Sequence, residues 1–375
     1  MKQHTARTTS ATTVSAESAQ TKQTQSPDLR LIRVDKIASS TINLRLDHNL
    51  EITNDFSSFA APRAGDVVIA RTLTDNATYN ILELTTGRQA KLNPGDVIAG
   101  VLGYRRALKG FVGDVPNTLK AGDRLHLLNM GGLIGQCLGH HHSLSNAIEV
   151  EVVGMPVRDG RPLNISEGAI EPLETLSAVA PLVIVAGTCM NSGKTYAATE
   201  IIKHLARAGM KVAAAKLSGV ACLRDTLNMQ DHGAVKTMSF LDCGLPSTVG
   251  LQSLAPYAKG IVSQLAEIEP DAIVIELGDG IIGGYGVDSV FTDSELVSST
   301  AAVVFCANDF VGAWGGRELM GKLGVGIAVV SGPVTDSKMG IDYVESELGI
   351  AAANAVNSGE RLGEVVKERL EQWSR

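Results

Sequence analysis

Short apolar runs, each preceded by a Gly-Asp pair, recur in the first half of the chain. Glycine supplies the positive φ of a tight turn, and the aspartate side chain can bond the backbone that follows. Segments 63–73, 93–103 and 120–130 have this form, and 79–92 is typical of a hairpin that turns at Thr86-Gly87. No helical period of convincing length interrupts residues 29–175. We therefore predict an all-β domain there, a barrel or a sandwich.

From about residue 176 the pattern changes to apolar runs that alternate with helical periods. Continuous Val, Ile and Ala runs suit strands of a parallel sheet that are buried on both faces. We expect such strands at 181–187, 211–219, 270–280, 300–309 and 324–332. Helical spacing predicts helices at 195–210, 252–270, 313–324, 339–350 and 358–375. This alternation predicts a doubly wound α/β domain with a mostly parallel sheet over residues 176–375.

Composition narrows the class of protein. The chain has 375 residues, enough for two domains, and its formal net charge is −7 without a Lys/Arg run, which argues against nucleic-acid binding. Charges or glycines break every apolar run, so no membrane span is predicted. Five cysteines without a CxxC pair argue against a disulfide framework and favour a reducing, cytoplasmic setting.

Residues 1–28 differ from the rest of the chain. They are rich in Thr, Ser, Gln and Ala and lack the apolar core of a secretory signal. A transit peptide is disfavoured because arginines are few and no amphipathic pattern is present. We predict a disordered tail.

The strongest motif lies between the first predicted strand of the α/β domain and the helix that follows. The sequence from Gly187 to Thr195 is GTCMNSGKT. A strand, a glycine-rich turn and a helix that starts at Gly-Lys-Thr form a phosphate loop, in which backbone N–H groups bind the phosphates. Lys194 would neutralise the β- and γ-phosphates, and the Thr195 hydroxyl would bind Mg²⁺. The predicted nucleotide site also includes Gly187, Thr188, Asn191, Ser192 and Gly193.

The loop is one residue longer than the common phosphate loop, because five residues separate Gly187 from Gly193. In this it resembles the Gly-Thr-x4-Gly-Lys-Thr loop of dethiobiotin synthetase. A similar loop occurs in cobyrinic acid synthases, within the branch of P-loop folds that contains the molybdopterin-guanine dinucleotide biosynthesis adaptor. The resemblance covers residues 182–333 and does not extend to the β-domain.

Further segments carry the resemblance. Lys216 and Ser218-Gly219 match a lysine and a Ser-Gly that face the transferred group in the synthetase, which implies a catalytic role for Lys216 beside Lys194. The run AIVIELGDGIIGG is similar to the strand of the synthetase that ends in Glu-Gly-x-Gly-Gly, and this match implies that Glu276 binds Mg²⁺. The segment 224–234 is similar to an adaptor stretch, and the matching positions are Asp225, Thr226, Gly233 and Ala234.

The metal ligands also have a physical reason. Mg²⁺ among phosphate oxygens takes one or two carboxylates. Glu276 ends a predicted parallel strand, and ligands of open α/β sheets bind at the carboxyl ends of the strands. Asp225 is the second candidate, with a solvated helix start as its alternative role. Asp279 is held in reserve.

Other candidates are weaker. His140, His141 and His142 are consecutive, so their side chains alternate in direction and suit a polar loop at the interdomain cleft better than one metal site. Cys189 is more typical of a small loop residue than of a nucleophile. Asn308 is a candidate for base or substrate contact, with a helix N-cap at Asn308 or Asp309 as the alternative. A guanine-reading Asn-Lys-x-Asp pattern is absent, which favours ATP over GTP.

These patterns lead to alternative functions. The first hypothesis is an ATP- and Mg²⁺-dependent enzyme that activates an unidentified small acceptor, a carboxylate or similar group, by phosphoryl transfer. The second is a nucleotide-binding adaptor that couples nucleotide state to a partner protein through the β-domain. A third is a P-loop chain like the D-glutamate N-acetyltransferase-like proteins, which binds without hydrolysis. A homodimer that completes the site is left open.

Overall fold

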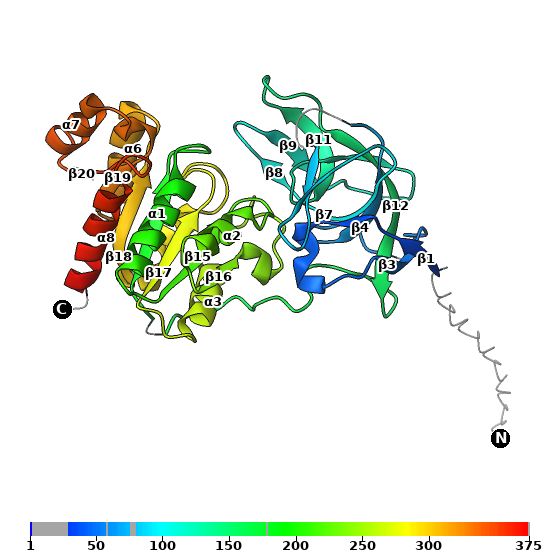
Figure 1. Cartoon of the computed structure of the whole chain (residues 1–375). Helices are drawn as coiled ribbons and strands as arrows, with labels where there is room; N and C mark the ends of the chain where they lie inside the picture. Colours follow the sequence, from blue (N-terminus) through cyan, green and yellow to red (C-terminus); the bar gives the residue numbers. More distant parts are fainter. Residues whose placement is uncertain (2–28, 58, 76–79, 178, 374–375) are drawn as a thin grey trace.

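The structure, a computed structural model, describes residues 1, 29–57, 59–75, 80–177 and 179–373. Two parts follow one another along the chain and lie side by side (Figure 1). We call residues 29–165 the β-rich part and residues 182–373 the α/β part. The tail predicted at 1–28 lies outside the described residues except for Met1. Among the helices described, none is both long and apolar enough to cross a bilayer.

Strands and one short 3-10 helix, η1 (Ser39–Leu44), make up the regular structure of the described β-rich part. One sheet has the order β1-β3-β12-β4-β7-β11-β9-β8, with β10, β13 and β2 attached beside it. Its strands are β1 (Leu29–Arg33), β2 (Lys36–Ile37), β3 (Asn49–Thr53), β4 (Val67–Thr72), β7 (Val97–Leu102), β8 (Arg105–Arg106), β9 (Phe111–Asp114), β10 (Arg124–Leu127), β11 (Leu133–His140), β12 (Ile148–Arg158) and β13 (Arg161–Pro162). The predicted hairpin is the separate pair β5 (Ile81–Glu83) and β6 (Gln89–Lys91).

The three Gly-Asp pairs form the same kind of turn ahead of β4, β7 and β10. Their glycines have φ values near +90°, which only glycine adopts without strain: Gly65 (88°), Gly95 (91°) and Gly122 (88°). Each aspartate accepts a hydrogen bond from the amide three residues before it: Asp66 from Arg63, Asp96 from Asn93 and Asp123 from Lys120. The sequence analysis expected each aspartate to bond the backbone that follows it. The carboxylate instead bonds the backbone that precedes it, because the glycine turns the preceding chain back over the carboxylate.

The α/β part contains a parallel sheet in the order β16-β15-β17-β14-β18-β19-β20. Its strands are β14 (Leu182–Gly187), β15 (Val212–Ser218), β16 (Lys236–Ser239), β17 (Ala272–Leu277), β18 (Thr300–Cys306), β19 (Val329–Ser331) and β20 (Ala351–Ala352). Every residue of β14, β15 and β17 is buried, as the continuous apolar runs predicted for a sheet covered on both faces. The predicted parallel α/β sheet is confirmed.

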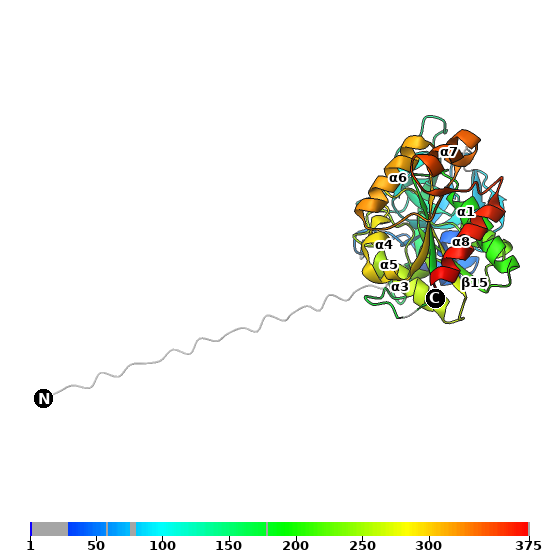
Figure 2. The same cartoon turned by 90° about the vertical axis from the view of Figure 1, so that its left-hand side faces the viewer.

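Helices cover both faces of this sheet. Val183 and Val185 pack toward α1, α2 and α8, whereas Leu182 and Ile184 pack toward α3 to α7. Figure 2 shows α1 and α8 on one side of the sheet and α4, α5 and α6 on the other. The helices are α1 (Lys194–Arg207), α2 (Arg224–Asp231), α3 (Ala255–Ala266), α4 (Asp288–Thr292), α5 (Ser294–Ser298), α6 (Phe310–Lys322), α7 (Lys338–Ser346) and α8 (Gly359–Trp373), with the 3-10 helices η2 (Phe240–Cys243) and η3 (Pro333–Thr335).

The helix α2 was expected only as an alternative, through a helix start at Asp225, and the short helices α4 and α5 and the edge strands β16 and β20 were not predicted. Helix α2 has eight residues, of which only Thr226 and Met229 are buried, so its apolar stripe is too short to show a helical period. It lies at the edge of the α/β sheet that faces the β-rich part (Figure 1).

Candidate functional site

The predicted phosphate loop joins β14, in the middle of the sheet, to the start of α1. Gly193 caps α1 with φ at 90°, a left-handed conformation that suits glycine, and Asn191 has φ at 61°. The Lys194 Nζ donates to the carbonyl oxygen of Cys189 at 2.6 Å and to the Ser192 Oγ at 3.3 Å. Burial and the nearby Lys216 ammonium lower the pKa of Lys194. The phosphate loop thus surrounds the Lys194 ammonium and accepts its hydrogen bonds.

Two further loops touch the phosphate loop so closely that their contact residues must be glycine. A Cβ on Gly280, after β17, would lie 2.1 Å from the carbonyl oxygen of Thr188. One on Gly332, after β19, would lie 2.2 Å from the carbonyl oxygen of Ser192. These contacts leave the phosphate loop little freedom to move, and a binding loop held in one conformation pays less entropy when a ligand binds.

Glu276 is the centre of the site. It lies near the carboxyl end of β17, beside Val185 of β14 and Lys216 of β15. Its Oε1 accepts hydrogen bonds from the Thr195 hydroxyl at 2.9 Å and from the Lys216 ammonium at 2.5 Å. The side chain is only 1% exposed, and its Oε2 has no hydrogen-bond partner within the part of the chain that the structure describes.

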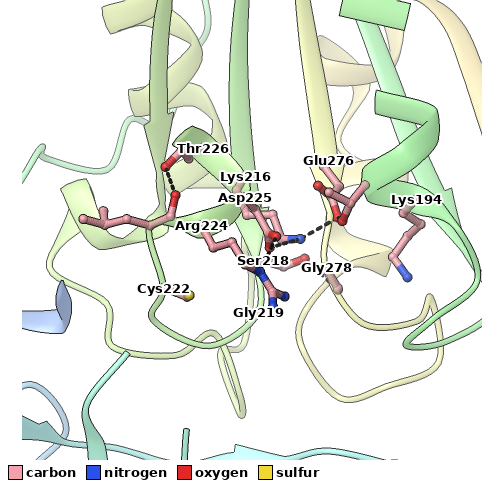
Figure 3. Close-up of polar contacts among 12 residues, drawn as sticks. Lys194, Lys216, Ser218, Gly219, Cys222, Arg224, Asp225, Thr226, Glu276 and Gly278 are labelled. Carbon is pink, nitrogen blue, oxygen red and sulfur yellow. Dashed lines mark hydrogen bonds and ion pairs between the residues drawn. The ribbon is translucent and has the colours of Figure 1, made fainter. Parts of the chain in front are cut away.

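Lys216 lies between two carboxylates (Figure 3). Its Nζ is 2.5 Å from the Glu276 Oε1 and 2.9 Å from the Asp225 Oδ2. Burial alone would lower the pKa of Lys216, but the charges of Asp225 and Glu276 outweigh it and hold that pKa above its ordinary value. The ammonium in turn lowers the pKa of Asp225. The predicted metal ligands Asp225 and Glu276 are therefore brought together, with Lys216 as the bridge between them.

The remaining candidates lie around this centre. Asp279 has φ at 61°, and burial raises its pKa against the opposing charge of Lys194. The Asn308 Nδ2 donates to the Cys189 Sγ at 3.0 Å, which places Asn308 against the phosphate loop. Asp309 is the N-cap of α6, because its side chain accepts from the Gly312 amide. The Ser218 hydroxyl donates to the carbonyl oxygen of Gly278 at 3.0 Å and so ties β15 to the loop after β17.

The three histidines lie apart from the phosphate loop. His140 ends β11 and, with His126 and Cys137, lines a cavity of about 410 Å³ whose walls all belong to the β-rich part. The His141 ring bonds the Ser143 hydroxyl at 2.8 Å. Among the residues described, no group of three or more His, Cys, Asp or Glu side chains is placed to hold a metal ion.

The sequence analysis missed the groups of the β-rich part that contact the α/β part; we call this contact region the junction. The buried carboxylate of Glu83 accepts the Leu223 amide of the α/β part, and the Asn129 Nδ2 donates to the carbonyl oxygen of Ala221 at 2.7 Å. The Arg106 amide donates to the Tyr285 hydroxyl at 3.2 Å, and burial raises the pKa of Tyr285 to about 12. The one available signal was Glu83 itself, a charged residue in the otherwise apolar run of residues 81–84.

No family model matches this chain, and no curated protein matches it. Some solved structures resemble it slightly. Chloroplast FtsY from Physcomitrella patens is 14% identical at a TM-score of 0.35, over 55% of this chain and 70% of that one. The signal recognition particle 54 kDa protein from Aeropyrum pernix K1, solved in complex with GDP, is 17% identical at a TM-score of 0.34, over 56% of this chain and 52% of that one.

The FtsY of Thermotoga maritima gives a similar result, with 15% identity and a TM-score of 0.32 over 54% of this chain and 74% of that one. The fold of residues 182–373 rests on its own geometry. A parallel sheet with a glycine-rich loop between a central strand and a Gly-Lys-Thr helix start is the arrangement of a P-loop NTPase.

Proposed function

We propose that the chain binds a nucleoside triphosphate together with Mg²⁺ at the phosphate loop. The observation that carries this proposal is the buried carboxylate of Glu276, whose Oε2 has no hydrogen-bond partner among the described residues. A buried carboxylate oxygen without a partner is costly, whereas an oxygen ligand for a hard cation is what Mg²⁺ requires. The Thr195 hydroxyl, 2.9 Å from Oε1, supplies a second oxygen at the same place.

The residues take separate roles in this proposal. Lys194 neutralises the β- and γ-phosphates, and the backbone of 188–193 with the start of α1 donates hydrogen bonds to them. Thr195 and Glu276 hold the cation. Asp225 pairs with the Lys216 ammonium beside Glu276, and its negative charge offsets the positive charge of Lys216 near the cation. ATP is the first choice of nucleotide, because the Asn-Lys-x-Asp pattern is absent. A cytoplasmic setting belongs to the same proposal, and the free state of all five cysteines supports it.

Replacing Glu276 with glutamine tests the metal site. The amide keeps the size of the side chain but removes the charge that binds Mg²⁺, so we expect the Mg²⁺ concentration for half-maximal nucleotide binding to rise at least tenfold. Binding measured in EDTA should change less. Displacement of a fluorescent ATP analogue by ATP or by GTP gives the affinity for each nucleotide, and the comparison tests which base is preferred. Equal losses with and without Mg²⁺ would assign Glu276 a structural role.

Phosphoryl transfer to a small acceptor is the activity that we infer from the resemblance to dethiobiotin synthetase. It predicts that one member of a panel of carboxylate metabolites stimulates ADP release by wild-type protein at saturating ATP. An adaptor would instead turn over slowly whatever small molecule is added. The contacts of the β-rich part with Ala221 and Leu223, just before α2, favour the adaptor as a second candidate, because they join the segment that leads to Asp225 to a separate part of the chain. ADP release across the panel separates the two functions.

A further inference from the structure

A buried glutamate of the β-rich part is bonded to the residues that directly precede α2. Glu83 ends β5 and is 1% exposed. Its Oε2 accepts from the Leu223 amide at 2.7 Å and from the Ser39 hydroxyl at 2.5 Å, and its Oε1 accepts from the Cys222 thiol at 3.2 Å. Both carboxylate oxygens are therefore occupied, and two of the three donors, Cys222 and Leu223, lie directly before α2.

Other contacts hold the same segment. The hairpin turn at Gly87 packs on α2, since a Cβ there would lie 2.2 Å from the Leu227 Cδ1. Just before α2, a Cβ on Gly131 would lie 1.9 Å from the carbonyl oxygen of Ala221, which also accepts the Asn129 side chain at 2.7 Å. The start of α2 and the residues before it are thus held by the β-rich part.

Helix α2 in turn carries a residue of the proposed metal site. Leu223 precedes the helix and Asp225 lies in its first turn, two residues further on. The Asp225 Oδ2 is 2.9 Å from the Lys216 Nζ, and that ammonium is 2.5 Å from the Glu276 Oε1. Figure 3 shows Cys222, Asp225, Lys216 and Glu276 in this succession. A displacement of Leu223 would therefore move Asp225 relative to the Lys216 ammonium that it shares with Glu276.

We propose that Glu83 is a positioning residue of the nucleotide site, which sets the place of Asp225 and through it the affinity for Mg²⁺. The inference rests on the proposed function, since it needs a cation at Glu276. A group that orients a metal-binding set without touching the metal commonly changes metal affinity 10- to 100-fold when it is replaced. A role confined to holding the two parts together would change stability alone.

Variants of Glu83 that differ in side-chain length and hydrogen-bonding groups distinguish a positioning role from a role in stability alone. Glu83→Gln keeps an oxygen for the Leu223 amide and an NH₂ group for the Cys222 sulfur. Glu83→Asp keeps the charge but is one methylene shorter, and Glu83→Ala removes the acceptor. We expect the Mg²⁺ concentration for half-maximal binding of a fluorescent ATP analogue to rise roughly tenfold in the alanine and aspartate variants. It should stay within about twofold of wild type in Glu83→Gln, and binding in EDTA should be unchanged throughout.

Gln89→Ala is the matched control, because Gln89 is exposed on β6 directly opposite Glu83. Maleimide labelling of Cys222, followed by peptide mass spectrometry, reports the docking of α2 without any nucleotide. The proposal is overturned if Cys222 labels faster in the Glu83 variants while the Mg²⁺ requirement stays at the wild-type value. Wild-type binding that ignores Mg²⁺ would instead reject the proposed function. Should Glu83→Ala not fold, the Glu83→Asp variant decides alone.

Discussion

Replacing Lys194 with alanine is expected to lower the affinity for a fluorescent ATP analogue about thirtyfold or more. Truncating one partner of a buried charge pair costs about 2–5 kcal/mol, and each 1.4 kcal/mol is a factor of ten. The Lys194 side chain is buried in the phosphate loop, where its ammonium bonds only groups of that loop among the described contacts. Fluorescence titration measures the affinity.

Lys203→Ala is the control for this loss. Lys203 lies on the same helix α1, and its ammonium pairs with Glu200 at 2.6 Å, away from the phosphate loop. Both variants replace one lysine with alanine, so they change the net charge by the same amount. We expect Lys203→Ala to bind as wild type does. Circular dichroism should show both variants folded. If Lys194→Ala binds the analogue as tightly as wild type, the loop is not a phosphate site.

Replacing Lys216 with methionine should destabilise the protein by about 3–5 kcal/mol in EDTA, the usual cost of removing one partner of a buried ion pair. The ammonium is the group that lies between Asp225 and Glu276, so methionine leaves the buried Glu276 carboxylate and the partly buried Asp225 carboxylate without their shared cation. Urea unfolding followed by circular dichroism measures the loss. Added Mg²⁺ should restore part of the stability, because it supplies the missing positive charge.

The double variant Lys216→Met, Asp225→Asn tests the cause. It removes one of the two unpaired carboxylates, so it should be more stable than Lys216→Met alone. A double-mutant cycle with Asp225→Asn then gives the coupling energy of the pair. Additive losses would mean that Lys216 and Asp225 contribute independently, contrary to the 2.9 Å contact.

The α/β part was predictable because its signals are local. A buried apolar run, a glycine turn and an amphipathic helix stand next to one another around Gly187 to Thr195, and the structure places them as β14, loop and α1. The position of Glu276 follows from the same logic, since the carboxyl ends of parallel strands meet at one edge of the sheet. The ion pair of Lys216 with Glu276 was not predictable, because it depends on which strands are neighbours.

The junction with the β-rich part escaped the sequence analysis for a different reason. Its hydrogen bonds join residues that are far apart in the chain, such as Glu83 and Leu223, and no local sequence pattern predicts them. The Gly-Asp turns were recognised from their residues, but the partner of each aspartate depended on how the glycine directs the preceding chain. Local chemistry located the elements, whereas the contacts between them required the fold.

The bond between Glu83 and Leu223 also has a consequence for the order of folding. It spans 140 residues of chain, and contacts of such separation form late because the entropy of closing the intervening loop must be overcome first. Both sheets can form from nearer contacts, and the start of α2 settles only when they meet. The Leu223 amide is therefore protected from hydrogen exchange by this bond only while both units are folded and docked, so it should exchange at least as fast as the amides buried inside either sheet.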